Sequence, residues 1–417
     1  MARDRDDDIR DDDNDNGAAR PGPMSGVRVV EVAAWVAAPA SGMILADWGA
    51  DVIKVEPFNG DPARGIVTLG PLGINPPFEF DNRGKRSVAI DIATPDGLSV
   101  LLDLVDKADV FITNLRPVTL EALAIDPDRL LARFPSLVYA SVTGYGHDSA
   151  YRDRPSYDIG GFWARSGSAA SHTVEGAPPP TLRGGYGDHL TAMTLAGGIA
   201  AALFERQTNG RGRHVTTSLA RVGVYAVGQD FNVKQRAGIT FPMGNPRDVA
   251  GNPMLNSYQA SDGRWFWLLG LQPDRHWPTV LAAIERLDLA DDERFATLAD
   301  RRLHSRELIE ELDKAFLTKT RDEWEDRFAE CGVWYEPVLS IGEALDDPVI
   351  QGSGAFIEVA AADGSIPGIA TPVDFVGSVG VRGRPVPAHG EHTDDVLQEL
   401  GHDWDTIIQW KIGGAVL

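Results

Sequence analysis

Short apolar runs alternate with helical patterns along the first part of the chain. Strands are predicted at 27–33 and 51–55 with a helix at 41–48 between them, and the alternation continues through 88–92, 98–105, 110–113 and 138–142. Strands that alternate with helices are typical of a parallel sheet whose strands are joined by crossover helices. We therefore predict an α/β fold with a large Rossmann-like domain at 24–225.

The pattern changes beyond about Tyr225. Before that point, the run from Gly187 to Arg206 predicts a long helix, whose many alanines and glycines allow close packing against a sheet or another helix. Beyond it, the Ser261-Asp262-Gly263 turn before an aromatic run and a capping box formed by Thr320 and Glu323 indicate a smaller α+β domain with linkers at 226–335. Residues 336–417 return to strands and turns and end with helices near 395–400 and 405–411.

Composition is that of a large globular enzyme. The 417 residues are 43% hydrophobic and 24% charged, and no apolar run is long enough to cross a bilayer, so no membrane partner is predicted. A single cysteine, Cys331, excludes an internal disulfide and fits a reducing compartment, so we expect a cytoplasmic protein. No secretory signal pattern opens the sequence.

The net charge of −22 argues against nucleic acid as a partner, because proteins that bind phosphate backbones present cationic surfaces. Part of this charge lies in residues 1–16, where eight aspartates accompany three arginines and apolar residues are almost absent. Such a segment cannot bury enough surface to offset the entropy of ordering it. We predict a disordered acidic tail at 1–23.

Nucleotide and metal motifs are incomplete. Gly144-Tyr145-Gly146 lacks the third glycine of a dinucleotide fingerprint, and Gly84-Lys85 lacks the upstream glycine of a phosphate loop because Glu79 stands there. The nine histidines are scattered, and none forms a His-x-x-x-His pair with a nearby carboxylate. No metal site is predicted.

Asp158 has a position that suits two different roles. It follows a predicted strand, the Gly144-Tyr145-Gly146 turn and Pro155, and it precedes the apolar run Ile159, Phe162, Trp163 and Ala164. Aspartate before such a run commonly accepts hydrogen bonds from the free amides of a helix start. A carboxylate at this place is also a candidate covalent nucleophile. Local spacing alone favours the cap.

Segments spread along the whole chain surround Asp158 in a recognisable order. They are Val30-Glu31-Val32, Ala38-Pro39, the run from Leu45 to Pro57, Gly60-Asp61-Pro62-Ala63-Arg64, Asn82-Arg83-Gly84-Lys85-Arg86-Ser87, Asn114-Leu115-Arg116-Pro117, Ser141-Val142-Thr143-Gly144-Tyr145-Gly146 and the run from Pro387 to Thr393. From about Val27 to the C-terminus, the sequence resembles the family III CoA-transferases, the group that includes formyl-CoA transferase, carnitine-CoA transferases and the α-methylacyl-CoA racemases.

The resemblance implies a function, a site and an assembly. It places Asp158 where the transferases carry their catalytic aspartate, which attacks an acyl-CoA thioester and passes CoA to a carboxylic acid. It implies that 336–417 rejoins and completes the large domain, and that two copies form an interlocked homodimer. No tightly bound cofactor is expected, because coenzyme A enters as part of a substrate.

CoA phosphates call for cations, and the family's CoA-contacting segments hold several. The residues predicted to bind CoA are Trp35, Val36, Ala37, Arg64, Arg83, Lys85, Arg86, Asn114, Leu115 and Arg116. The family often stabilises its anionic intermediates with a glycine-rich loop of the smaller domain. Here Gly251-Asn252-Pro253 is the nearest match, and it lacks the run of glycines.

Two alternatives remain open at this stage. A racemase of this family needs two proton-transfer groups at the α-carbon of a thioester, and it carries histidine immediately before the catalytic aspartate, where this chain has Tyr157. Asp188 matches a second racemase carboxylate, beside His189, although an aspartate there also suits a helix cap. The third possibility, a catalytically silent CoA-binding protein, does not explain the presence of Asp158.

Overall fold

The computed structural model describes residues 20–66, 75–240, 247–361, 364–379 and 384–417. Most of the predicted acidic tail, 1–19, lies outside the described residues. The chain separates into two compact units. Of the described residues, the larger unit contains those within 20–168, 182–228 and 354–417, and the smaller unit contains those within 169–181 and 229–353.

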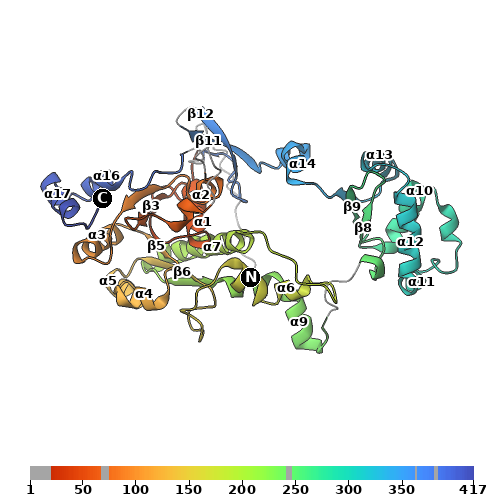
Figure 1. The fold of residues 1–417 in the computed structure, drawn as a ribbon, viewed down its shortest axis with the longest axis horizontal. Helices are drawn as coiled ribbons and strands as arrows, with labels where there is room; N and C mark the ends of the chain where they lie inside the picture. Colours follow the sequence, from red (N-terminus) through yellow and green to blue (C-terminus); the bar gives the residue numbers. More distant parts are fainter. Residues whose placement is uncertain (1–19, 67–74, 241–246, 362–363, 380–383) are drawn as a thin grey trace, which may run out of the picture. The chain divides into compact units, whose positions relative to one another are not determined.

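A parallel six-stranded sheet forms the centre of the larger unit, with the order β4-β3-β2-β5-β6-β7 (Figure 1). Its strands are β2 (Arg28–Val32), β3 (Asp51–Glu56), β4 (Arg86–Ala89), β5 (Val110–Thr113), β6 (Val138–Thr143) and β7 (His214–Ser218). The predicted α/β fold class is confirmed. The polar sequence of β7 carries no strand pattern of its own, and this strand was missed.

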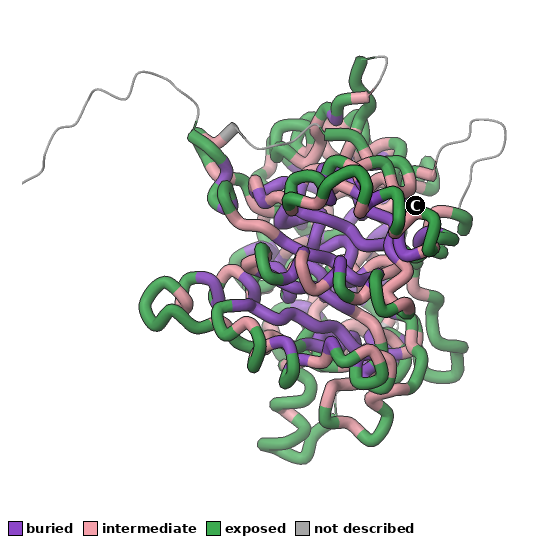
Figure 2. Tube along the Cα trace, turned by 90° about the vertical axis from the view of Figure 1, so that its left-hand side faces the viewer, coloured by how far each residue is buried: buried purple, intermediate pink, exposed green. Residues whose placement is uncertain are grey.

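Helices cover both faces of this sheet. On one face lie α1 (Ala37–Asp47), α7 (Tyr186–Asn209) and α8 (Leu219–Ala226); on the other lie α3 (Pro95–Asp106), α4 (Pro117–Ala122), α5 (Pro127–Arg133), α16 (Thr393–Glu399) and α17 (Trp404–Ile412). In β2, β3, β5 and β6, residues on the two faces enter different cores; in β2, for example, Val29 joins the first and Val30 the second. Figure 2 shows the buried residues enclosed by exposed segments.

The remaining elements of the larger unit are short. They are β1 (Arg20–Pro21) paired with β13 (Ser378–Val379), η1 (Pro62–Gly65), α2 (Pro76–Asn82), η3 (Ile159–Ala164) and the hairpin β11 (Phe356–Ala361) with β12 (Gly364–Ile369). Residues 354–417 thus belong to the same unit as the N-terminal strands. Figure 1 shows α16 and α17 near α3, and the His392 amide donates to the carbonyl of Ser87 over 2.9 Å.

The two helices α1 and α7 pack closely because their sequences are rich in small residues. Every residue of α1 is buried, and α1 contacts α7 as the glycines and alanines of the long helix predict. At Gly187 a Cβ atom would come within 2.5 Å of the Phe162 ring, so this position requires glycine. The predicted start of α1 at Ser41 was wrong. The helix begins at Ala37, and Pro39 lies in its first turn, where no intrahelical donor is needed.

The smaller unit has its own core around a three-stranded antiparallel sheet of order β10-β9-β8. Its elements are α6 (Ser168–Ser171), α9 (Gly228–Ala237), η4 (Arg247–Val249), β8 (Ser257–Gln259), β9 (Trp265–Leu268), α10 (Pro273–Ala283), η5 (Leu287–Ala290), α11 (Leu298–Leu303), α12 (Ser305–Phe316), α13 (Arg321–Cys331), β10 (Tyr335–Pro337), α14 (Ile341–Asp346) and α15 (Pro348–Gly352). The first residues of α6 and α9, Ser168 and Gly228, are still assigned to the larger unit. The predicted capping box is confirmed, because Thr320 and Glu323 bond reciprocally at the start of α13. Within the Gly251-Asn252-Pro253 segment, Asn252 donates to the Gly270 carbonyl over 3.0 Å.

Candidate functional site

A cavity of about 470 Å³ opens at the carboxyl ends of β2, β5 and β6. In the sheet, β3 and β4 follow β2 on one side, whereas β6 and β7 follow β5 on the other. The boundary between β2 and β5 is therefore the point where the strand order reverses, and α/β folds bind ligands at such points. The cavity thus occupies the position that the topology favours for a substrate.

The structure brings most of the predicted site residues to this cavity. Its lining includes Trp35, Val36 and Ala37 after β2, Asn114, Leu115 and Arg116 after β5, and Tyr157 and Asp188. These segments are far apart in sequence. They meet because the parallel strands that precede them end at the same edge of the sheet.

Asp158 is buried next to this lining, with 6% of its surface exposed. It precedes η3, a single π-helical turn, and its Oδ1 accepts a hydrogen bond of 2.7 Å from the amide of the adjacent Ile159. Its Oδ2 is buried and has no hydrogen-bond partner among the described residues. An N-cap side chain instead accepts a hydrogen bond from the amide two or three residues further along the helix. The arrangement leaves one carboxylate oxygen unused by the fold.

A second carboxyl group, that of Asp188, interacts electrostatically with Asp158. Burial raises the pKa of Asp188 to about 7, and the negative charge of Asp158 adds to this effect. The neighbouring His189 pairs with a different carboxylate, because its Nε2 lies 2.9 Å from Oδ1 of the buried Asp81. Burial alone would lower the pKa of His189, but the bond to Asp81 and the negative charges of Asp81, Asp188 and Asp158 together outweigh burial and raise that pKa. One acidic group therefore lines the cavity and a second lies next to it, and the two have different environments.

The four predicted cations outside the cavity are bound to carboxylates of the protein. Arg64 pairs with Glu56 over 2.7 Å and donates to the Pro387 carbonyl, and Arg83 pairs with the buried Asp47 over 2.6 Å. Lys85 lies 2.9 Å from Glu31 with its side chain fully buried, and Arg86 bonds both Asp51 and Glu399. These contacts tie the N-terminal strands to one another and to the C-terminal segment. Binding of CoA phosphates by these four residues stays a prediction.

Two cations of the cavity lining were missed in the sequence. Arg152 and Arg154 join Arg116 there. Arg152 pairs with Glu121 over 2.8 Å, whereas the Arg154 guanidinium lies over the ring of Tyr151 at 5.6 Å from its centre. Both arginines belong to the segment that follows the Gly144-Tyr145-Gly146 turn, and their position close before Asp158 is the signal that could have identified them.

Comparison with known proteins decides the family. A family model described as CoA-transferase family III matches residues 24–393. The chain belongs to CoA-transferase family III. The predicted family and enzyme class are confirmed, and CoA thioesters are the substrates of such transferases.

Curated relatives of this family III chain match it along nearly its whole length. It is 32% identical to (R)-2-hydroxy-4-methylpentanoate CoA-transferase of Clostridioides difficile, over 93% of this chain and 98% of the relative. It is 30% identical to cinnamoyl-CoA:phenyllactate CoA-transferase of Clostridium sporogenes, over 91% and 93%. It is 31% identical to succinate–glutarate CoA-transferase of Agrobacterium fabrum, over 91% and 96%.

Solved structures agree with the fold of this CoA-transferase. A CAIB/BAIF family protein from Brucella suis superposes with a TM-score of 0.80 and 29% identity, covering 91% of this chain and 100% of the other. The hypothetical protein Rv3272 from Mycobacterium tuberculosis gives a TM-score of 0.79 at 29% identity, covering 90% and 99%. Among the described residues, no helix is long and apolar enough to cross a membrane, and no group of three or more potential metal ligands occurs.

Proposed function

We propose that this CoA-transferase works through Asp158 as a covalent nucleophile. The observation that carries the proposal is a buried carboxylate with one unpaired oxygen, beside a cavity at the reversal point of a parallel sheet. An ionised carboxylate needs no base to remove a proton before it attacks, so a Ser-His-Asp type of arrangement is unnecessary. The resemblance to the family supports the same residue.

The proposed reaction proceeds through a mixed anhydride and then an enzyme–CoA thioester, both formed on the side chain of Asp158. An oxygen of Asp158 attacks the thioester carbonyl, the C–S bond breaks, and CoA leaves as a thiolate while a mixed anhydride forms on the enzyme. The thiolate then attacks the aspartyl carbonyl, so that the donor acid departs as a carboxylate and an enzyme–CoA thioester remains. The acceptor carboxylate repeats both steps in reverse order. No proton is gained or lost over the cycle.

The cavity suits an acid with an apolar body. Trp35, Val36, Leu115 and Leu219 give it apolar walls, and Arg116 adds a cation. Two of the relatives are named for transferring CoA to or from 2-hydroxy-4-methylpentanoate and phenyllactate, acids with branched or aromatic side chains. We infer that this transferase acts on acids of comparable size and apolar character. We also infer that it works in the cytoplasm, because its single cysteine fits a reducing compartment.

The covalent intermediate can be trapped. We expect incubation with a panel of acyl-CoA donors of this class, followed by hydroxylamine and peptide mass mapping, to convert Asp158 to its hydroxamate. The label should require acyl-CoA and should be absent when free CoA replaces it. Modification of a different carboxylate, with Asp158 unmodified during turnover, would contradict the proposed nucleophile.

A homodimer is the second part of the proposal. Large apolar side chains are exposed on the outer faces of α7 and α8, among them Phe204 at 72% and Tyr225 at 87%. Exposed apolar surface of this kind is typical of a face that a partner covers. The interlocked family arrangement makes a second copy the expected partner. Light scattering should give a mass near twice the chain's 45.0 kDa across a wide dilution range, and a folded, active monomer would contradict the dimer.

A further inference from the structure

Trp35 holds a backbone conformation that residues with a side chain rarely adopt. Its φ of +70° lies in the left-handed region, where the Cβ atom crowds the backbone. Such strain persists where the surroundings fix it, and it is common at functional sites. Since Trp35 lines the cavity, the contacts that hold its backbone bear on the site.

Three buried or half-buried side chains hold the segment 33–35. Asn114 binds Ala34 on both sides, because its Oδ1 accepts from the Ala34 amide at 3.1 Å and its Nδ2 donates to the Ala34 carbonyl at 2.6 Å. Lys54 Nζ donates to the Ala33 carbonyl over 3.0 Å. The Trp35 amide donates to Oδ1 of Asp61 over 3.1 Å. Asp61 therefore makes the contact at the strained residue itself.

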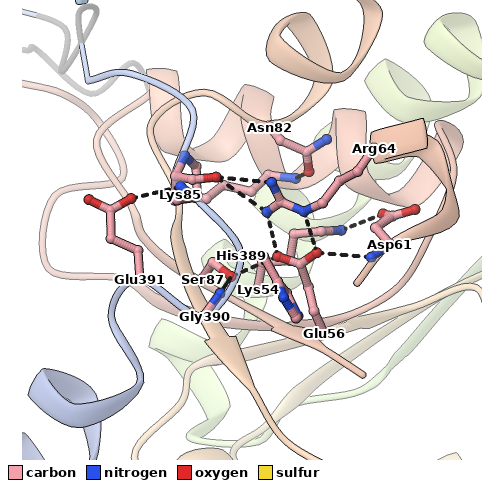
Figure 3. Close-up of polar contacts among 12 residues, drawn as sticks. Lys54, Glu56, Asp61, Arg64, Asn82, Lys85, Ser87, His389, Gly390 and Glu391 are labelled. Atoms are coloured by element: carbon pink, nitrogen blue, oxygen red, sulfur yellow. Dashed lines mark hydrogen bonds and ion pairs between the residues drawn. The ribbon is translucent and has the colours of Figure 1, made fainter. Parts of the chain in front are cut away.

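Asp61 is itself fixed by a buried cluster of charges. It is 2% exposed, and its Oδ2 lies 2.9 Å from Nζ of the fully buried Lys54, which also pairs with Glu31 over 3.0 Å. The Asp61 amide donates to Glu56 over 3.0 Å. Figure 3 shows Lys54, Asp61 and Glu56 gathered together beneath Arg64. Buried ion pairs with this many bonds have little freedom to move, since an unpaired charge there would be costly.

The other end of this chain of contacts reaches the proposed nucleophile. The indole of Trp35 meets the ring of Tyr157 edge-on, with 5.5 Å between ring centres and an angle of 81°. Edge-to-face contacts are a favoured geometry for aromatic pairs. Tyr157 immediately precedes Asp158 in the sequence.

We propose that Asp61 is a positioning residue for CoA transfer, which fixes the left-handed backbone of Trp35 so that the indole braces Tyr157 and thereby Asp158. This inference rests on the proposed role of Asp158. Asp61 does not line the cavity, so it would act on the reaction only through Trp35. Misplacing a nucleophile by a fraction of an ångström slows attack, so the effect falls on the rate of adduct formation rather than on acyl-CoA binding.

A double-mutant cycle between Asp61→Asn and Trp35→Gly tests the proposal. Asparagine offers one oxygen where Asp61 uses two, so it cannot serve both Lys54 and the Trp35 amide. Glycine at 35 removes the indole and adopts a φ of +70° without strain. We expect each single variant to lower kcat about tenfold or more, with the KM for acyl-CoA in Asp61→Asn within a factor of about three. The double variant should be no slower than the slower single variant.

Asp47→Asn is the matched control. Asp47 is also a buried aspartate paired with a cation, Arg83, but it makes no hydrogen bond to the 33–35 segment in the described structure. Its effect should multiply with that of Trp35→Gly. If the effects of Asp61→Asn and Trp35→Gly also multiply, Asp61 has only a general structural role and the proposal is overturned.

Two further variants cover the case in which Asp61→Asn does not fold. Trp35→Phe keeps a ring edge for Tyr157 and should retain most of the activity, whereas Trp35→Ala should lose about tenfold. Native activity in Trp35→Ala would overturn the proposal. Failure of the nucleophile assignment has a different signature, because it appears as activity in Asp158→Ala whatever the cycle gives.

Discussion

Replacing Asp158 with alanine is expected to lower kcat for CoA transfer by at least about 1,000-fold, because the variant has no group that can accept the acyl unit. The buried site should tolerate the change, since only the hydrogen bond from the Ile159 amide to Oδ1 is lost and Oδ2 has no partner in the described fold. Steady-state transfer between an acyl-CoA and an acceptor acid, followed by chromatography of both thioesters, measures the effect. Circular dichroism should show an unchanged fold.

Asp148→Ala provides a control from the same connecting segment. Asp148 is exposed and lies ten positions before the proposed nucleophile, so its replacement should leave kcat unchanged. Asp158→Asn is a weaker test because the amide can hydrolyse back to aspartate. Transfer by Asp158→Ala at a tenth of the native rate or faster would exclude the covalent mechanism proposed for this residue.

The parts of this fold that the sequence predicts are those encoded locally. The strands β2, β3, β5 and β6 are readable because strands buried on both faces are mostly apolar, although β2 and β3 also bury Glu31 and Lys54. The capping box at Thr320 is readable because both of its partners lie within one helical turn. The cavity lining after β2 and β5 follows from the order of the strands, since ligand sites gather where parallel strands end.

The features that the sequence does not reveal depend on partners far away in the chain. Arg83, Lys85 and Arg86 form a basic island in the sequence, but the carboxylates that hold them are Asp47, Glu31 and Asp51, with Glu399 more than 300 residues away. The left-handed backbone of Trp35 also has no local signal, because the side chains that bond residues 34 and 35, Asn114 and Asp61, lie elsewhere in the chain. Sequence patterns reveal which groups are present, whereas their pairing is decided by tertiary contacts.

The second large effect is a pH dependence of the free energy of unfolding that arises from Asp188. Its direction follows from the difference between the pKa of this carboxyl in the folded and in the unfolded protein. Burial, together with the charge of Asp158, raises the pKa of Asp188 from 3.8 to about 7 in the folded protein. A carboxyl with a raised pKa stabilises the fold fully at low pH, and this contribution is lost as pH rises through the folded pKa. Between pH 5.5 and pH 8 the free energy of unfolding should therefore fall by up to about 2 kcal/mol from this group.

Asp188→Asn should remove this pH dependence. Asparagine is neutral throughout, so the variant should melt a few degrees higher than the native protein at pH 8, with the difference shrinking toward pH 5.5. The other groups whose charges act on Asp188 are Asp158, His189 and Asp81, and the substitution leaves all three in place. Melting temperatures of both proteins across this range make the comparison. Equal slopes for the two proteins would show that Asp188 does not titrate near neutrality.

The same pair of proteins bears on the chemistry at the α-carbon. If Asp188 is neutral below pH 7 and thereby only avoids a second negative charge beside Asp158, native CoA transfer should decline above pH 7. The pH profile of Asp188→Asn should then stay flat through that pH.

Proton transfer by Asp188 predicts a different result. It would give rapid incorporation of deuterium at the α-carbon of a chiral 2-methylacyl-CoA in D₂O, and the Asp188→Asn variant would abolish it. We expect little deuterium, because Tyr157 stands where a racemase of this family carries histidine, and because His189 is bound to Asp81. Rapid exchange would instead assign Asp188 to acid–base catalysis and make racemisation an activity of this chain.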